Sequence, residues 1–228
     1  MDKNEEKVLL ACPLFADIGS EDLNAMLACM GARRMDMEKG QAVLREGEPA
    51  LFVGVILSGA LELVRTDFFG NRSIVAHMGP GELFGESFAC AGVKAMPVSA
   101  VAVENGTCLL LDCRRITVSC TNACAFHSRA IRNLLRLVAE KNLLLDQKIA
   151  VTAQRTTRER LLAYLMTLAK KQGSHTVTVP YDRQGLADYL EVDRSGLSTE
   201  IGKLTREGVL SAKKNVFILR DASTLYVR

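Results

Sequence analysis

Basic and hydroxyl-bearing side chains gather near the end of this 228-residue chain. They are Arg194, Ser195, Ser198, Thr199 and Lys203. Guanidinium, ammonium and hydroxyl groups form hydrogen bonds with base edges and phosphates in the major groove of DNA. The chemistry that this segment predicts is therefore the binding of duplex DNA.

Two short helices must position these side chains. The first is expected over residues 182–190 and the second over residues 194–207, with a turn at Glu191 and Val192 between them. Asp193 is a natural N-cap for the second helix, and Gly208 ends it. The inward-facing positions are Leu186, Ala187 and Leu190, then Leu197, Ile201 and Leu204. This pattern predicts a helix-turn-helix.

A hairpin wing is expected after the second helix, over residues 209–219, with Lys213 and Lys214 at its tip. The remaining candidate DNA contacts are Arg183, Gln184 and Asp193. Residues 153–228 hold 13 Lys and Arg against 8 Asp and Glu, whereas residues 1–152 hold 16 against 18. An ordinary helical hairpin is the alternative, but the cap, turn, wing and local positive charge together favour DNA binding.

A longer helix is expected over residues 122–152, which contain neither Gly nor Pro. An apolar seam with one polar member runs along it at heptad spacing, through Ile131, Leu135, Val138, Asn142, Leu145, Ile149 and Thr152. At ~1.5 Å per residue the seam is about 33 Å long, which is enough for a dimer interface. A neighbouring stripe of Leu134, Leu137 and Leu144 is expected to pack on the helix's own domain. A core helix within a single chain remains the alternative.

Short apolar runs separated by glycines fill residues 35–112, and this spacing predicts a many-stranded antiparallel β-roll. The expected fold is therefore α+β, with an N-terminal antiparallel β-roll, a long dimerisation helix and a C-terminal winged helix-turn-helix. The expected domains are residues 1–121, 122–152 and 153–228. Ser20 is expected to cap a short helix before the roll, and Thr157 the helix that follows the seam.

Several other classes of protein are disfavoured by composition. Apolar residues make up 48% and charged residues 24% of the chain, as in globular proteins. The apolar runs are too short for a membrane helix, and no secretory signal is evident, so a cytoplasmic protein without membrane contact is expected. No nucleophile–base–acid set, phosphate-binding glycine loop or metal shell is evident, so an enzyme is not expected.

The seven cysteines are odd in number and include no Cys-x-x-Cys pair. This pattern favours neither a disulfide framework nor a zinc site. Cys120 and Cys124 would share a helix face and are expected to be buried thiols. A redox role for the cysteines is left open.

The order of these parts, together with two segments, resembles the Crp/Fnr superfamily of bacterial transcription regulators. One segment is Gly79-Pro80-Gly81-Glu82-Leu83-Phe84-Gly85-Glu86, and the other is Arg183-Gln184-Gly185-Leu186-Ala187-Asp188-Tyr189-Leu190 with Asp193-Arg194-Ser195. The resemblance implies a homodimer, a DNA operator as partner, and a small effector that is bound in the roll and repositions the DNA-binding domains. RNA polymerase is a further candidate partner.

The same resemblance places the effector site at Gly85, Glu86, Ser87, Phe88, Val98 and Ser99, with Asn142 and Asp146 of the long helix. Cyclic-nucleotide-binding members carry an Arg-Ser or Arg-Thr pair about ten residues after Gly-Glu, and its guanidinium neutralises the cyclic phosphate. This chain has no Arg between Arg72 and Arg114, and the ammonium of Lys94 cannot replace the bidentate fork. A small effector other than cyclic AMP, more apolar or less anionic, is therefore expected.

Other departures concern cofactors and the recognition helix. Only Cys12 and Cys29 lie near the N-terminus, too few for the iron–sulfur cluster of oxygen-sensing members. His77 is expected on a strand and exposed to solvent, and His127 has no evident partner, so the cofactor is left unknown. Thr199 stands where many related regulators have an Arg, so the preferred DNA half-site is expected to differ from the common half-site of the family. A sensor of small molecules or thiol redox state whose output is protein contact is the alternative function.

Overall fold

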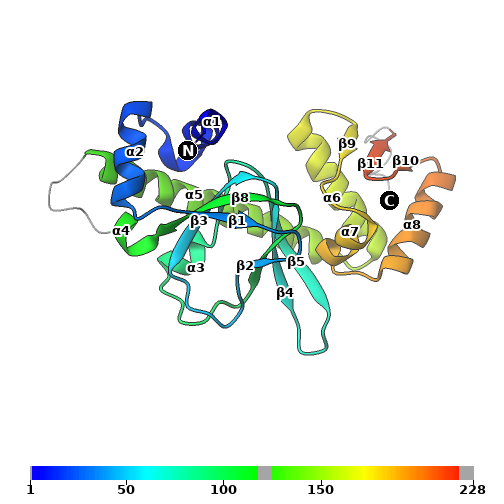
Figure 1. Cartoon of the computed structure of the whole chain (residues 1–228). Helices are drawn as coiled ribbons and strands as arrows, with labels where there is room; N and C mark the ends of the chain where they lie inside the picture. Colours follow the sequence, from blue (N-terminus) through cyan, green and yellow to red (C-terminus); the bar gives the residue numbers. More distant parts are fainter. Residues whose placement is uncertain (1, 118–124, 221–228) are drawn as a thin grey trace. The chain divides into compact units, whose positions relative to one another are not determined.

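A computed structural model describes residues 2–117 and 125–220 of the chain (Figure 1). The chain divides into two compact units. The first comprises Met1–Asn71 and Val75–Asn142, and the second comprises Arg72–Ile74 and Leu143–Arg228. Within the described residues, no helix has the length and apolar character needed to cross a membrane.

Two four-stranded sheets form the β-roll of the first unit. One has the order β1-β8-β3-β6, with all its pairings antiparallel, and the other has the order β2-β7-β4-β5, with β7 antiparallel to both β2 and β4. The strands are β1 (Arg33–Met37), β2 (Ala42–Leu44), β3 (Phe52–Ser58), β4 (Leu61–Thr66), β5 (Arg72–Met78), β6 (Leu83–Phe84), β7 (Ser99–Ala102) and β8 (Gly106–Asp112). The β-roll expected over residues 35–112 is thus confirmed.

Close backbone approach explains one of the glycines that punctuate the roll. A Cβ on Gly106 would lie 2.1 Å from the carbonyl oxygen of Ser58, on the neighbouring strand β3. Only glycine fits at that point of the pairing. The apolar residues between the glycines fill the roll, where Ile56, Leu61 and Phe84 are fully buried.

Five short helical segments complete the first unit around the roll. They are α1 (Lys3–Ala11), η1 (Pro13–Phe15), α2 (Ser20–Cys29), α3 (Glu86–Cys90) and α4 (Cys113–Thr117). The expected N-cap of α2 is wrong by one residue, since Gly19 is the cap and Ser20 the first helical residue. Buried side chains of α1, η1 and α2 join those of β3 and β8 in a second apolar core.

The long helix α5 extends over Ala125–Thr152, as Figure 1 shows in green. Leu134 and Leu137 are buried in the core of the first unit, as the sequence predicts, but Leu144 is 52% exposed. The prediction that Leu144 packs on its own domain is therefore wrong. The division between the two compact units falls within α5, after Asn142.

The second unit is a winged helix-turn-helix. Its elements are α6 (Thr157–Gln172), β9 (Thr176–Thr178), α7 (Arg183–Leu190), α8 (Arg194–Arg206), β10 (Leu210–Lys213) and β11 (Val216–Leu219). The three strands form an antiparallel sheet in the order β10-β11-β9. The N-cap of α6 is Thr156 rather than Thr157, because the Thr156 hydroxyl accepts the Glu159 N–H and the Glu159 carboxylate accepts the Thr156 N–H.

Candidate functional site

Aspartate caps set the start of both helices of the helix-turn-helix. The Asp182 carboxylate accepts the Gly185 N–H at 2.7 Å, and the Asp193 carboxylate accepts the Gly196 N–H at 2.8 Å. Hydrogen bonds from the Ser195 hydroxyl and from this N–H lower the pKa of Asp193. Glu191 ends α7 in the left-handed conformation with φ of 57° and lets the chain turn sharply into α8. The starts of α7 and α8 and the end of α7 are therefore set by residues at or next to these positions.

The apolar face of α8 is buried, and its other side is open. Leu197, Ile201 and Leu204 lie in the core of the second unit. The predicted contact residues on α8 that are exposed are Arg194, Ser195, Ser198, Thr199 and Lys203. The exposure expected for these five side chains is therefore confirmed, whereas their contact with DNA stays a prediction.

The predicted contact residues differ in how free their side chains are. The Ser195 hydroxyl is bound to the Asp193 carboxylate, and the Lys203 ammonium lies 3.3 Å from a Glu200 carboxylate oxygen. The described residues show no ion pair for Arg194, whose guanidinium stands exposed at the first position of α8. Arg194 is thus the cation most available to a ligand at this helix start.

Arg183 packs on the wing instead of pointing freely into solvent. Its guanidinium lies 5.6 Å from the centre of the Phe217 ring, and Nη2 donates to the Lys214 carbonyl at 3.5 Å. Burial lowers the pKa of Arg183. Gln184 is exposed and donates to the Asp188 carboxylate, while Lys213 and Lys214 are exposed at the wing tip. Arg183 therefore joins α7 to the wing.

A buried ion pair lies at the start of α3 in the first unit. Glu86 is 2% exposed, and its Oε1 lies 2.9 Å from Nζ of Lys141 on α5. The same ammonium donates to the Leu83 carbonyl at 2.5 Å. The second carboxylate oxygen, Oε2, has no hydrogen-bond partner among the residues described. A buried acceptor without a partner is costly unless a ligand or water satisfies it.

Sequence reasoning missed Lys141, although a signal was present. Ala130, Leu134 and Leu137 step along the inward face of α5, and Lys141 is the next position at this spacing. A charged residue on an apolar stripe indicates an internal partner of opposite charge.

The other predicted effector residues lie in different surroundings. Gly85 caps α3 with a φ of 76°, where a Cβ would approach Leu44 to 2.7 Å. Val98 is buried in the roll core, and Phe88 packs against that core. The Ser99 hydroxyl accepts the Glu46 N–H at 3.0 Å. The Ser87 hydroxyl donates to Glu86, and Asn142 and Asp146 are exposed on α5.

The two histidines considered as ligands both have protein contacts. His77 is only partly exposed, and its Nδ1 lies 3.5 Å from a Glu62 carboxylate oxygen, so the expectation of a solvent-exposed ring is wrong. His127 is buried, and its Nε2 lies 3.0 Å from the Arg115 carbonyl and 3.9 Å from the Cys29 sulfur. Cys120 and Cys124 lie outside the described residues.

Large apolar side chains are exposed along α5. They are Leu135 at 70%, Leu143 at 65%, Leu144 at 52%, Leu145 at 42% and Ile149 at 64% exposure. Ile131 and Val138 of the predicted seam are partly buried. The exposed apolar positions of α5 therefore include Leu143 and Leu144, which lie off the predicted seam.

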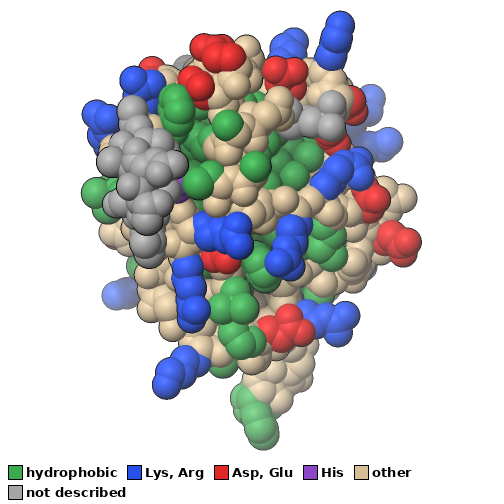
Figure 2. All heavy atoms as spheres, turned by 60° about the vertical axis from the view of Figure 1, so that its left-hand side comes forward, with side chains coloured by type: hydrophobic (Ala, Val, Ile, Leu, Met, Phe, Trp, Pro, Cys, Tyr) green, Lys and Arg blue, Asp and Glu red, His purple; other side chains and the backbone are tan. Residues whose placement is uncertain are grey.

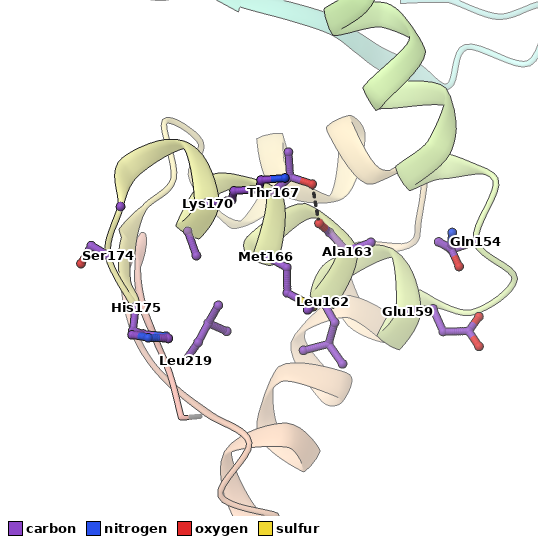
Figure 3. Close-up of a pocket in the computed structure, with 12 residues that line it drawn as sticks. Gln154, Glu159, Leu162, Ala163, Met166, Thr167, Lys170, Ser174, His175 and Leu219 are labelled. Atoms are coloured by element: carbon purple, nitrogen blue, oxygen red, sulfur yellow. Dashed lines mark hydrogen bonds between the residues drawn. The ribbon is translucent and has the colours of Figure 1, made fainter. Parts of the chain in front are cut away.

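A hollow of about 730 Å³ lies in the second unit, between α6 and the end of β11. Leu162, Met166 and Leu219 line it, and Figure 3 shows His175 at one side of it. The Thr167 hydroxyl donates back to a carbonyl of its own helix at 2.8 Å. None of the predicted DNA-contact residues lines this hollow.

Comparison with protein families places two domains on the chain. Residues 34–117 match the cyclic nucleotide-binding domain, and residues 159–227 match the Crp-like helix-turn-helix domain. The first match covers the β-roll with α3 and α4, and the second covers α6 to the wing.

Two curated relatives and one solved structure are similar to this chain over most of its length. A cyclic AMP receptor protein of Thermus thermophilus is 26% identical over 93% of this chain and 94% of its own length. The nitrogen fixation regulation protein FixK of Azorhizobium caulinodans is 28% identical over 81% of this chain and 80% of its own. Among solved structures, the c-di-GMP-responsive regulator CLP of Xanthomonas campestris has a TM-score of 0.73 at 18% identity, covering 90% of this chain and 100% of CLP.

Proposed function

Because this chain belongs to the Crp/Fnr superfamily of transcription regulators, we propose that it acts as a homodimer whose two α8 helices read one operator in successive major grooves. The observation that carries this proposal is the capped start of α8, which presents Arg194, Ser198 and Thr199 on an exposed face. Helix-turn-helix dimers read two half-sites about one helical turn apart. Lys213 and Lys214 on the wing add phosphate contacts.

The dimer interface that we propose is the apolar face of α5. Ile131, Leu135, Val138, Asn142, Leu145 and Ile149 form the seam expected from the sequence. The exposure of Leu135 and Ile149 supports this interface, because large apolar side chains left exposed along a helix indicate an association site. Asn142 on the seam fixes the register of the two helices.

A pair of lysine variants tests this interface. Leu135→Lys places a charge on the seam and is expected to give monomers, since two copies would bury unpaired ammonium groups. Gln147→Lys makes a similar change at an exposed position off the seam and is expected to leave the dimer intact. Native mass spectrometry reports subunit number for both. Dimers of Leu135→Lys at concentrations where wild type dimerises would contradict the proposed seam.

The effector residues that we propose are those expected from the sequence, Gly85, Glu86, Ser87, Phe88, Val98, Ser99, Asn142 and Asp146, and Glu86 is the one for which the structure offers support. The effector is a small molecule other than cyclic AMP. Two features support this choice: residues 73–113 contain no Arg, and the ammonium of Lys141 is already paired with Glu86. An anionic phosphate would therefore find no guanidinium from this span to hold it. The partner-free Oε2 of Glu86 instead favours an effector with a hydrogen-bond donor.

Two measurements test this part of the proposal. Cyclic AMP at millimolar concentration is expected to leave both the melting temperature and the DNA affinity unchanged. Native mass spectrometry of protein purified from its own cells is expected to retain a different small molecule in wild type and lose it in Glu86→Ala. Saturable binding of cyclic AMP would overturn the choice of effector.

Selection of DNA from a random pool tests the main proposal. The protein is expected to enrich a sequence with two half-sites. We further propose that it acts in the cytoplasm and has no enzymatic activity. RNA polymerase is the proposed partner at the promoter. If no sequence is enriched, with or without cell extract metabolites, the function as a DNA-binding regulator fails, and an output through protein contact replaces it.

A further inference from the structure

Cys90 and Cys113 bring two thiols together in the first unit. Their sulfur atoms lie 3.9 Å apart, although the residues are separated by 23 positions and belong to different helices, α3 and α4. It is the one thiol–thiol contact within 4 Å in the part of the chain that the structure describes. Neither residue belongs to the DNA-contact or effector residues proposed above.

The pair is accessible from one side. Cys90 is exposed, whereas its contact partner Cys113 is only 5% exposed. Both line a surface hollow of about 690 Å³ together with three cationic residues, Arg33, Lys94 and Arg114. Figure 2 shows basic side chains (blue) beside side chains of the hydrophobic class (green) on the side of the molecule that it presents. A small solute can therefore reach Cys90 first.

The two thiols are chemically unequal. The hydrogen bond between them lowers the pKa of Cys90, against the opposing effects of burial and of Glu86. The same bond and burial raise the pKa of Cys113. The thiolate is the nucleophilic form of cysteine, so Cys90 is the sulfur that reacts and Cys113 is the one that keeps its proton.

We propose that Cys90 and Cys113 are a hydroperoxide-driven dithiol–disulfide switch. The Cys90 thiolate attacks one oxygen of the hydroperoxide, an S–O bond forms and the O–O bond breaks. The leaving oxygen takes up a proton and departs as water or an alcohol. The Cys113 sulfur then attacks Cys90, the S–S bond forms, and the hydroxyl leaves as water with the Cys113 proton. Two thiols are oxidised by two electrons, and the hydroperoxide is reduced.

Closing the bond brings the sulfurs from 3.9 Å to about 2.05 Å. Cys90 is the last residue of α3, and Glu86 is the first. The disulfide therefore ties the helix that carries Glu86 to the start of α4, and the Glu86–Lys141 pair lies one helical turn from the new bond. On the proposed function, oxidation thus alters the effector site and changes operator affinity severalfold.

Peptide mapping of the full-length protein tests the switch. Reduced protein is treated with stoichiometric hydrogen peroxide, and the remaining thiols are then alkylated. Before alkylation, the intact mass of wild type is expected to fall by the mass of two hydrogen atoms. After alkylation and digestion, a cross-linked Cys90–Cys113 peptide is expected. Cys113→Ser is expected to accumulate a dimedone-reactive sulfenic acid at Cys90, and Cys90→Ser neither product. Cys29→Ser is the matched control, because Cys29 is also exposed but contacts His127 instead of a thiol.

Absence of the Cys90–Cys113 peptide, or a link from either residue to Cys120 or Cys124, would overturn the switch. Operator binding by oxidised and reduced wild type is measured in parallel. Equal affinities would overturn the regulatory role while leaving DNA binding intact. A protein that binds no operator in either state would instead refute the proposed function. In that case, the presence or absence of the Cys90–Cys113 peptide would still test the dithiol site.

Discussion

Replacing Arg194 by alanine is expected to remove most of the preference for the operator over other DNA. Arg194 is the first residue of α8, is exposed and has no ion pair among the described residues, so its guanidinium is free to bind a guanine edge or a phosphate. One bidentate contact contributes about 1–3 kcal/mol of discrimination. Two copies in a dimer contribute about 2–6 kcal/mol, which is at least roughly a 30-fold change in the ratio of specific to non-specific affinity.

The assay is fluorescence anisotropy on the selected operator and on a scrambled duplex, across a series of salt concentrations. Arg206→Ala is the matched control, because this change removes the same charge at the other end of α8. The control is expected to lower affinity for both duplexes alike, with little change in their ratio. An unchanged ratio in Arg194→Ala, with the melting temperature of wild type, would refute the assignment of α8 as the reading helix.

Three further changes test separate parts of the structure. Lys213→Ala is expected to weaken binding to operator and scrambled DNA equally and to reduce the salt slope by about 0.9 for each phosphate that the variant no longer neutralises, measured in the same titrations. Thr156→Ala is expected to lower the free energy of unfolding by about 0.5–2 kcal/mol in urea, because the variant cannot form the capping box of α6, whereas Thr157→Ala changes it little. Lys141→Met leaves the Glu86 carboxylate buried without its cation and is expected to lower that free energy by about 3 kcal/mol, while the double variant with Glu86→Gln recovers most of it. Equal losses in the single and double variants would contradict a contribution of the Glu86–Lys141 ion pair to the free energy of unfolding.

Much of the second unit is predictable because its signals are local. Asp193 before an apolar 3.6-residue pattern, with Gly208 after it, fixes the extent of α8 within one residue. The sequence puts the cap of α6 one residue late because Thr156 and Thr157 are both good cap residues. The choice between them depends on which threonine pairs with Glu159, a contact that forms only in the folded helix.

The effector region is harder to predict. The resemblance points to Glu86, but not to Lys141, which lies 55 positions later and reaches Glu86 from α5. The inward position of Lys141 on an apolar stripe indicates an internal partner, yet the stripe does not say which carboxylate is opposite. The same holds for Cys90 and Cys113, whose spacing in the sequence carries no signal of contact.

Local signals in the amino-acid sequence are enough to predict the order of roll, long helix and helix-turn-helix and the exposed side of α8, because helix caps, glycine turns and apolar periodicity act over a few residues. Contacts between distant groups are seen only in the folded chain: Lys141 with Glu86, Arg183 with Phe217, and Cys90 with Cys113. The reason is that such pairs are set by how separate helices and strands pack together, and packing depends on shape and burial across the whole unit, which no local pattern encodes.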